Sequence, residues 1–109
     1  MKDYEKAINN CTPYLQVARS MSRGTLKALL MQADREIIYS IQTVMAIGRA
    51  HYYLGDHTPA ADPVSYFEDW RNEVPVFKSI NREAEVDYIV NNPELRCFVS
   101  CGMQIMTIF

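Results

Sequence analysis

Apolar residues recur at helical spacing through the middle of the chain. They fall mostly three or four positions apart, at Leu26, Leu29, Leu30, Ala33, Ile37, Ile41, Val44, Met45 and Gly48. This is the pattern of one buried helical face. Asp34 can cap a helix inside this stretch, so the pattern predicts either one long helix or two helices that meet near Ala33. Both alternatives place the stripe in the core.

Polar caps and helix breakers predict two helices before the stripe. Asp3 can cap a helix that runs to about Asn10, and Thr12–Pro13 either starts a new helix or kinks the first one. We expect Arg23–Gly24 to end a helix, because a basic last turn and a glycine are typical of a helix C-terminus. Thr25 can then cap the next helix.

Similar signals predict three helices after the stripe. Residues 55–61 are rich in breakers, and Asp62–Pro63 opens a helix that runs to about Glu73. A further helix spans about Asn81 to Val90, and Asn92–Pro93 begins the last one. A C-terminal strand from Met103 to Phe109 is an alternative for the final residues.

These elements predict an all-α fold, a compact single-domain bundle of about five or six short helices over residues 1–109. Residues 1–24 pack either on their own domain or on a partner chain. The length of 109 residues, with 49% hydrophobic and 22% charged residues, fits one soluble globular domain.

Charge and termini narrow the function classes. The net charge of -2 removes the cationic field that drives binding to nucleic-acid backbones, so nucleic acid is not the expected partner. Met1–Lys6 carries charges where a secretory leader needs an apolar core, and no apolar run reaches the roughly 18 residues of a membrane span. We therefore expect a cytoplasmic protein with no membrane partner.

Three blocks in the second half of the chain carry a family resemblance. They are Ile41 to Arg49, Asp69–Trp70, and Asp87–Val90 followed by Pro93 and Gly102. On these blocks, over roughly residues 34–103, the chain resembles a family of small bacterial proteins catalogued as domain of unknown function 3775. The resemblance implies a compact helical domain with no assigned activity.

Two departures from that family bear on partners. Ala50 stands where the family has a glycine, and an extended loop over residues 50–62 follows, which is where a partner surface would be added. The last helix is more apolar than the family's acidic one, which favours burial against another chain.

The cysteines and histidines could form a zinc site, or the cysteines could be buried free thiols. Cys97 and Cys101 share a helical face and could form a zinc site with His51 and His57, but their spacing matches no compact zinc motif. The third cysteine, Cys11, makes an odd number, which excludes a complete intramolecular disulfide framework. We expect buried thiols, no metal and no cofactor.

Catalytic and nucleic-acid functions find little support in the sequence. A cysteine nucleophile needs a neighbouring histidine, and the sequence places none of the three thiols beside one. Phosphate-binding glycine loops and metalloprotease motifs are absent. Arg19, Arg23 and Lys27 form a basic cluster that could bind an anion, or that compensates a helix C-terminus. We therefore predict no catalytic residues.

The aromatic residues of the chain indicate a binding function. Seven tyrosines and one tryptophan are typical of interface anchors, with the alternative that they form the core and its rim. The predicted partner-binding residues are Arg49, Tyr52, Tyr53, Tyr66, Trp70 and Phe98.

The leading hypothesis is a non-catalytic interaction module, a homodimer, that regulates or inhibits a macromolecular partner by stoichiometric binding. One version is a phage or mobile-element inhibitor of a bacterial defence complex. The first alternative is a small-ligand binder or enzyme that uses the loop with Arg49, His51, Asp56 and His57. The second is nucleic-acid binding through Arg19, Arg23 and Lys27.

Overall fold

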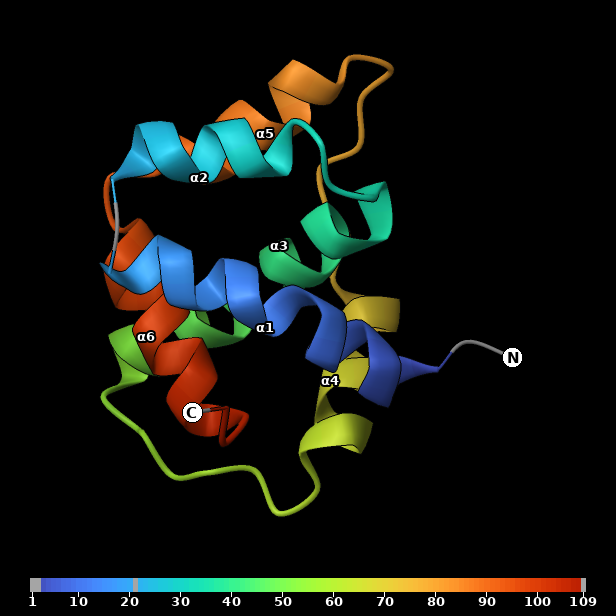
Figure 1. Ribbon diagram of the computed structural model, residues 1–109. Coiled ribbons are helices and arrows are strands. Elements are labelled where there is room, and N and C mark those ends of the chain that lie inside the picture. The colour runs from blue at the N-terminus through green and yellow to red at the C-terminus, as the bar shows by residue number, and fades with distance from the viewer. Residues whose placement is uncertain (1–2, 21, 109) are drawn as a thin grey trace.

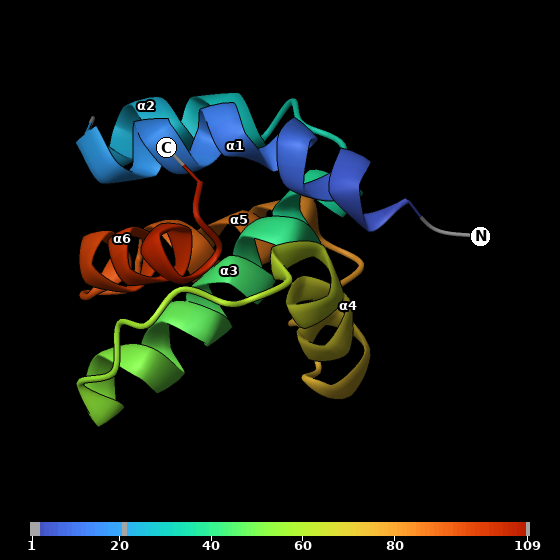
Figure 2. The same ribbon diagram turned by 90° about the horizontal axis from the view of Figure 1, so that it is seen from below.

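Six helices make up the fold of the computed structural model, which describes residues 3–20 and 22–108. Within these ranges no residue belongs to a strand, so the predicted all-α bundle is confirmed. Figure 2 shows α1 and α2 as one layer over α3, α5 and α6, with α4 at one end. The helices are α1 (Tyr4–Ser20), α2 (Arg23–Leu30), α3 (Arg35–Leu54), α4 (Pro63–Glu73), α5 (Arg82–Val90) and α6 (Leu95–Ile105).

The centre of the core is the crossing of α3 and α6. A β-carbon added at Gly48 would lie 1.8 Å from the carbonyl oxygen of Phe98, and one added at Gly102 would lie 2.3 Å from that of Val44. The two backbones therefore touch at a place where only glycine fits. This contact explains why Gly48 falls on the predicted core stripe.

The apolar last helix is covered by its own chain. Phe98, Val99 and Met103 of α6 are buried, and α1 and α3 pack against this helix. On the other side of the same contact, Cys11 and Leu15 of α1 are fully buried. The apolar character of α6 thus reflects the core of this chain, and residues of α1 pack on their own domain.

The N-terminal helices differ from the sequence prediction in their boundaries. α1 continues through Pro13 to Ser20, and α2 begins at Arg23, so the predicted helix end at Arg23–Gly24 is wrong. Ser22 caps α2, because its hydroxyl accepts a hydrogen bond from the N–H of Thr25. Thr25 is therefore not the cap.

The middle of the chain follows the two-helix alternative. Asp34 caps α3 by accepting from the N–H of Glu36 at 3.1 Å. α3 then runs to Leu54, so the predicted loop over residues 50–62 begins only at Gly55. Gly55 adopts the left-handed conformation, with φ of 70°, that ends the helix.

The later caps match the prediction, and the chain end does not. Asp62 and Asn81 cap α4 and α5 through their side chains. α6 begins at Leu95, after a turn in which Asn92 accepts from the N–H of Glu94. It runs to Ile105, so the strand alternative is wrong for residues 103–108; Phe109 lies outside the described residues. Among the described residues, no helix has the length and apolar character that crossing a bilayer requires.

Candidate functional site

An aromatic end patch lies where the last turn of α3 meets the start of α6. It consists of Tyr52, Tyr53 and Leu54, and the ring of Phe98 lies against the two tyrosines. The ring centroids of Tyr52 and Tyr53 lie 6.0 and 5.9 Å from that of Phe98, in edge arrangements. Phe98 is buried, whereas Tyr53 and Leu54 are 64% and 77% exposed. A buried ring thus supports two exposed aromatic rings and an exposed leucine.

Polar groups fix the orientation of the two tyrosines. The Tyr53 hydroxyl donates to Glu94 at 3.0 Å, and this hydrogen bond raises the pKa of Tyr53. The pKa of Tyr52 is also raised, chiefly by the neighbouring Cys97. Arg49 is exposed one turn before Tyr53. The patch therefore combines ordered aromatic surface with a charged rim, which is typical of protein interfaces.

The other two predicted partner-binding residues, Tyr66 and Trp70, lie in a separate cluster on α4. The Tyr66 hydroxyl is 2.8 Å from Nε2 of His51, and Nδ1 of His51 is 2.9 Å from the carbonyl oxygen of Asp56. Because a carbonyl only accepts, Nδ1 carries the hydrogen, and in the neutral ring Tyr66 donates to Nε2. Tyr66 and Trp70 are half-buried and in edge contact, so they pack the loop against α4 rather than forming an exposed aromatic surface.

The loop alternative corresponds to a hollow of about 420 Å³ beside this cluster. His51, Asp56, Tyr66 and Asp69 are among its lining residues. Both ring nitrogens of His51 already have hydrogen-bond partners, and Asp56 accepts from the N–H of Thr58, which lowers the pKa of that carboxyl. The polar groups therefore bond mainly to one another.

The structure brings one thiol beside a histidine, which the sequence could not show. Sγ of Cys101 lies 3.4 Å from Nδ1 of His57. Burial raises the pKa of Cys101, so it stays a protonated thiol, which is a poor nucleophile. Cys97, one turn earlier on α6, is exposed, and no group of three metal-ligating side chains occurs among the described residues.

We predict that the three cysteines differ sharply in reactivity. Cys97 should be alkylated by iodoacetamide in the native protein, because it is exposed. Cys11 is fully buried, and burial raises its pKa to about 12, so it should react only after unfolding. Cys101 should be protected for the same reason. Mass spectrometry of the labelled protein at pH 8, with and without urea, measures this; rapid native labelling of Cys11 would contradict it.

The predicted basic cluster is engaged in the fold. Arg23 donates to the carbonyl oxygen of Val90 at 2.7 Å, at the end of α5. Lys27 lies 3.1 Å from Glu83 and 3.0 Å from Asp87, and the hydrogen bond to Asp87 is the largest cause that raises the pKa of Lys27. Only Arg19 of the three is exposed with no such contact in the described chain. Of the two roles that the sequence offered, Arg23 thus fits compensation of a helix C-terminus, whereas Lys27 pairs with carboxylates of α5.

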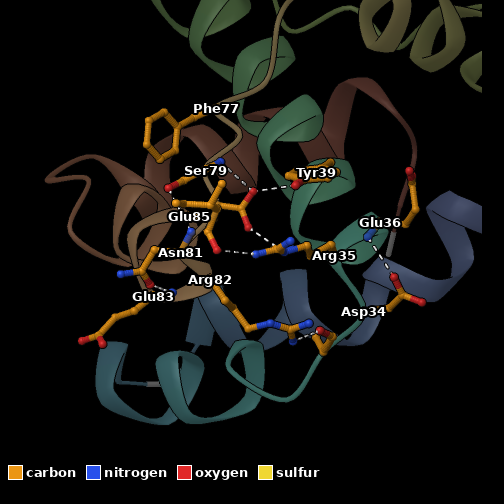
Figure 3. Close-up of polar contacts among 12 residues, drawn as sticks. Asp34, Arg35, Glu36, Tyr39, Phe77, Ser79, Asn81, Arg82, Glu83 and Glu85 are labelled. Atoms are coloured by element: carbon orange, nitrogen blue, oxygen red, sulfur yellow. Dashed lines mark hydrogen bonds and ion pairs between the residues drawn. The ribbon is translucent and has the colours of Figure 1, made fainter.

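Sequence reasoning missed a buried carboxylate, Glu85, which is fully buried on α5. Its oxygens accept from the Tyr39 hydroxyl at 2.5 Å and the N–H of Ser79 at 3.1 Å, and lie 3.0 Å from Nε of Arg35 (Figure 3). Burial alone would raise the pKa of Glu85, but these contacts and Arg82 outweigh it, so the pKa is lowered. A signal was present in the sequence, because Glu85 shares a helix face with the apolar residues Val86 and Ile89, which are buried with it.

No family model, curated protein or solved structure matches this chain in the comparisons. The resemblance to the domain of unknown function 3775 family therefore stays a prediction.

Proposed function

We propose that this protein is a non-catalytic interaction module that binds a partner protein through the aromatic end patch. The observation that carries the proposal is the exposure of Tyr53 over the buried ring of Phe98, next to the exposed side chain of Leu54 at the end of α3. A soluble domain gains no stability from leaving large apolar side chains exposed, and contiguous patches of this kind mark interaction sites. Tyrosines on a rigid helix bind at low entropic cost.

The arrangement of reactive groups supports a binding role. In the described chain, the thiol nearest a histidine belongs to the buried Cys101, and burial keeps it protonated. In the loop hollow, His51 and Tyr66 bond to each other and Asp56 accepts from the N–H of Thr58, and Glu85 is enclosed in the core. A binding module needs none of these groups to react.

A test is to introduce a negative charge into the patch and to remove one of its aromatic rings. We expect Leu54→Glu together with Tyr53→Ala to weaken partner binding by about thirtyfold or more, the loss typical of interface hot spots. The tagged protein is purified gently from its host, and native mass spectrometry identifies bound partners and their stoichiometry. Titration calorimetry with the purified partner then gives the affinity of each variant.

Leu29→Glu is the matched control. Leu29 is another exposed leucine, 42% exposed on α2, away from the patch, so the same charge there should leave partner binding unchanged. Far-UV circular dichroism confirms that each variant folds. Equal affinities for the wild-type protein and the patch variant would exclude the patch as the binding site.

Two narrower hypotheses belong to the same proposal. The module forms a homodimer, which native mass spectrometry measures directly. It also inhibits a bacterial defence complex, as a phage or mobile-element protein would, because stoichiometric inhibition needs no active site. A binding screen against purified defence nucleases tests this version.

A further inference from the structure

The segment between α4 and α5 runs as a strap, residues 74–81, past α3 (Figure 1). Its first and last residues have extended backbone angles, with ψ of 116° at Val74 and 113° at Asn81. The segment contains no helix or strand, yet it is fixed in place. The side chains that fix it all bond to one edge of its backbone or to its far end.

Gln42 of α3 binds the strap as a neighbouring strand would. Its amide oxygen accepts from the N–H of Phe77 at 2.6 Å, and its amide nitrogen donates to the carbonyl oxygen of Phe77 at 3.1 Å. Two residues later, the N–H of Ser79 donates to Glu85 (Figure 3). The inner edge of the strap is therefore paired by buried side chains of α3 and α5.

The outer edge of the strap is unpaired. In an extended chain the N–H and C=O of successive residues point to opposite edges, so those of Val76 and Lys78 face away from Gln42. Within the described chain these four backbone groups have no hydrogen-bond partner. Pro75, which has no N–H, falls on the inner edge and leaves the outer donors intact. This is the template that a further strand can join.

Two hollows adjoin the same segment. One, of about 270 Å³, is lined by Arg49, Tyr88 and residues 74–76, and another, of about 340 Å³, by Arg71, Lys78 and the same strap residues. The rings of Phe77 and Tyr88 stack at 5.1 Å beside the first and are 41% and 54% exposed. An added strand would thus find space for its alternate side chains, which is how strand addition becomes selective.

The charges beside this edge favour an acidic segment of a partner protein over a second copy of this chain. Arg49 has no hydrogen bond or ion pair within the described chain, and the ammonium of Lys78 contacts only the ring of Tyr39, at 5.3 Å. Arg49 and Lys78, which flank the strap, thus have no carboxylate partner within the described residues, although the net charge of the chain is -2. A second copy pairing antiparallel about Phe77 would bring two Lys78 side chains diagonally close, which disfavours it.

We propose that the outer edge of the strap binds an extended, acidic segment of a partner protein by strand addition. The backbone of that segment pairs with Val76 and Lys78, and its carboxylates face Arg49 and Lys78. The inference goes beyond the proposed function, because the strap backbone is not part of the aromatic end patch. Arg49 borders both surfaces, so the tests below use Lys78 for the strap and Leu54 for the patch.

Synthetic decapeptides test the proposal. A fluorescein-labelled peptide of alternating glutamate and valine is titrated with the whole protein at low salt, beside a matched peptide of alternating lysine and valine. We expect the acidic peptide to bind at least tenfold more tightly, and salt to weaken it. Equal binding of the two peptides, or no binding of the acidic one at 1 mM protein (about the weakest useful affinity), would overturn the proposal.

Two substitutions at one position separate backbone from charge. Lys78→Ala removes the ammonium and keeps the N–H, whereas Lys78→Pro removes both, and the inner edge stays intact in each. We expect Lys78→Pro to bind about fivefold more weakly than Lys78→Ala, the effect of one lost hydrogen bond. Circular dichroism and the urea midpoint establish that both variants fold. Equal affinities would rule out pairing through the strap backbone.

Two further outcomes assign the site elsewhere. Loss of peptide binding in Leu54→Glu would place the peptide on the aromatic end patch and overturn the strap assignment. Self-association in sedimentation without peptide, abolished by Lys78→Pro, would show that a second copy occupies the edge. Failure of patch binding with intact peptide binding would instead count against the proposed function alone.

Discussion

Gly48→Ala should be among the most destabilising single substitutions in this protein, lowering the free energy of unfolding by about 3 kcal/mol or more. The added methyl would lie 1.8 Å from the carbonyl oxygen of Phe98 and 2.8 Å from the backbone nitrogen of Gly102. These are backbone atoms, so no side-chain rotation relieves the clash, and α3 and α6 must separate. Urea unfolding followed by far-UV circular dichroism measures the loss.

Gly24→Ala is the control for this prediction. Gly24 also lies inside a helix, but a β-carbon added there has no atom within 4 Å. Alanine has the higher helix propensity, so this change should stabilise the protein by about 0.5–1 kcal/mol. A Gly48→Ala protein as stable as the wild type would mean that α3 and α6 do not cross in backbone contact.

Glu85→Ala should cost about 2–4 kcal/mol, because removing this fully buried carboxylate leaves the donors around it unsatisfied. The substitution strips Arg35 of its ion pair and leaves the Tyr39 hydroxyl and the N–H of Ser79 without acceptors. It also frees the strap near its end, at Ser79. Glu83→Ala is the control on the same helix: Glu83 is exposed and its ion pair with Lys27 is on the surface, so the loss should be below about 1 kcal/mol.

The same carboxylate predicts a pH dependence. The pKa of Glu85 is lowered in the folded protein, because Tyr39, Ser79, Arg35 and Arg82 outweigh the effect of burial. Its contribution to stability is therefore fully present above the ordinary glutamate pKa of about 4.3. It is lost as the pH falls from there through the lower, folded-state pKa. Urea midpoints between about pH 3 and 7 should fall less steeply with acid in Glu85→Gln than in the wild type. Parallel curves would contradict this.

The number and type of the elements could be predicted from the sequence. The apolar stripe, the caps at Asp34 and Asp62, and the breakers at residues 55–61 are local signals, and all appear in the structure. These signals work because capping and helical periodicity depend on residues within a turn of one another. At Arg23–Gly24 the basic residue and the glycine predicted a helix end, but α2 begins there, so this boundary was misplaced.

The candidate site required contacts between distant residues. The sequence predicted Tyr52 and Tyr53 as partner-binding residues together with Tyr66 and Trp70, but only the fold separates the two pairs, because Tyr66 and Trp70 pack the loop around His51. A tyrosine reads the same in the sequence whether its ring is exposed or covered. The burial of a tyrosine ring depends on which helix packs over it, and for Tyr52 and Tyr53 this is set by the crossing of α3 and α6.

The sequence by itself determined an all-helical domain, its core stripe and an aromatic-rich composition, because these follow from local pattern and residue type. Only the tertiary structure decided that Glu85 is enclosed by Arg35 and Tyr39, and that the strap is paired along one edge by Gln42. Each of these contacts joins residues 35 to 50 positions apart. Such contacts form because the packing of apolar faces brings the helices together, and the polar side chains then pair with whatever that packing places beside them.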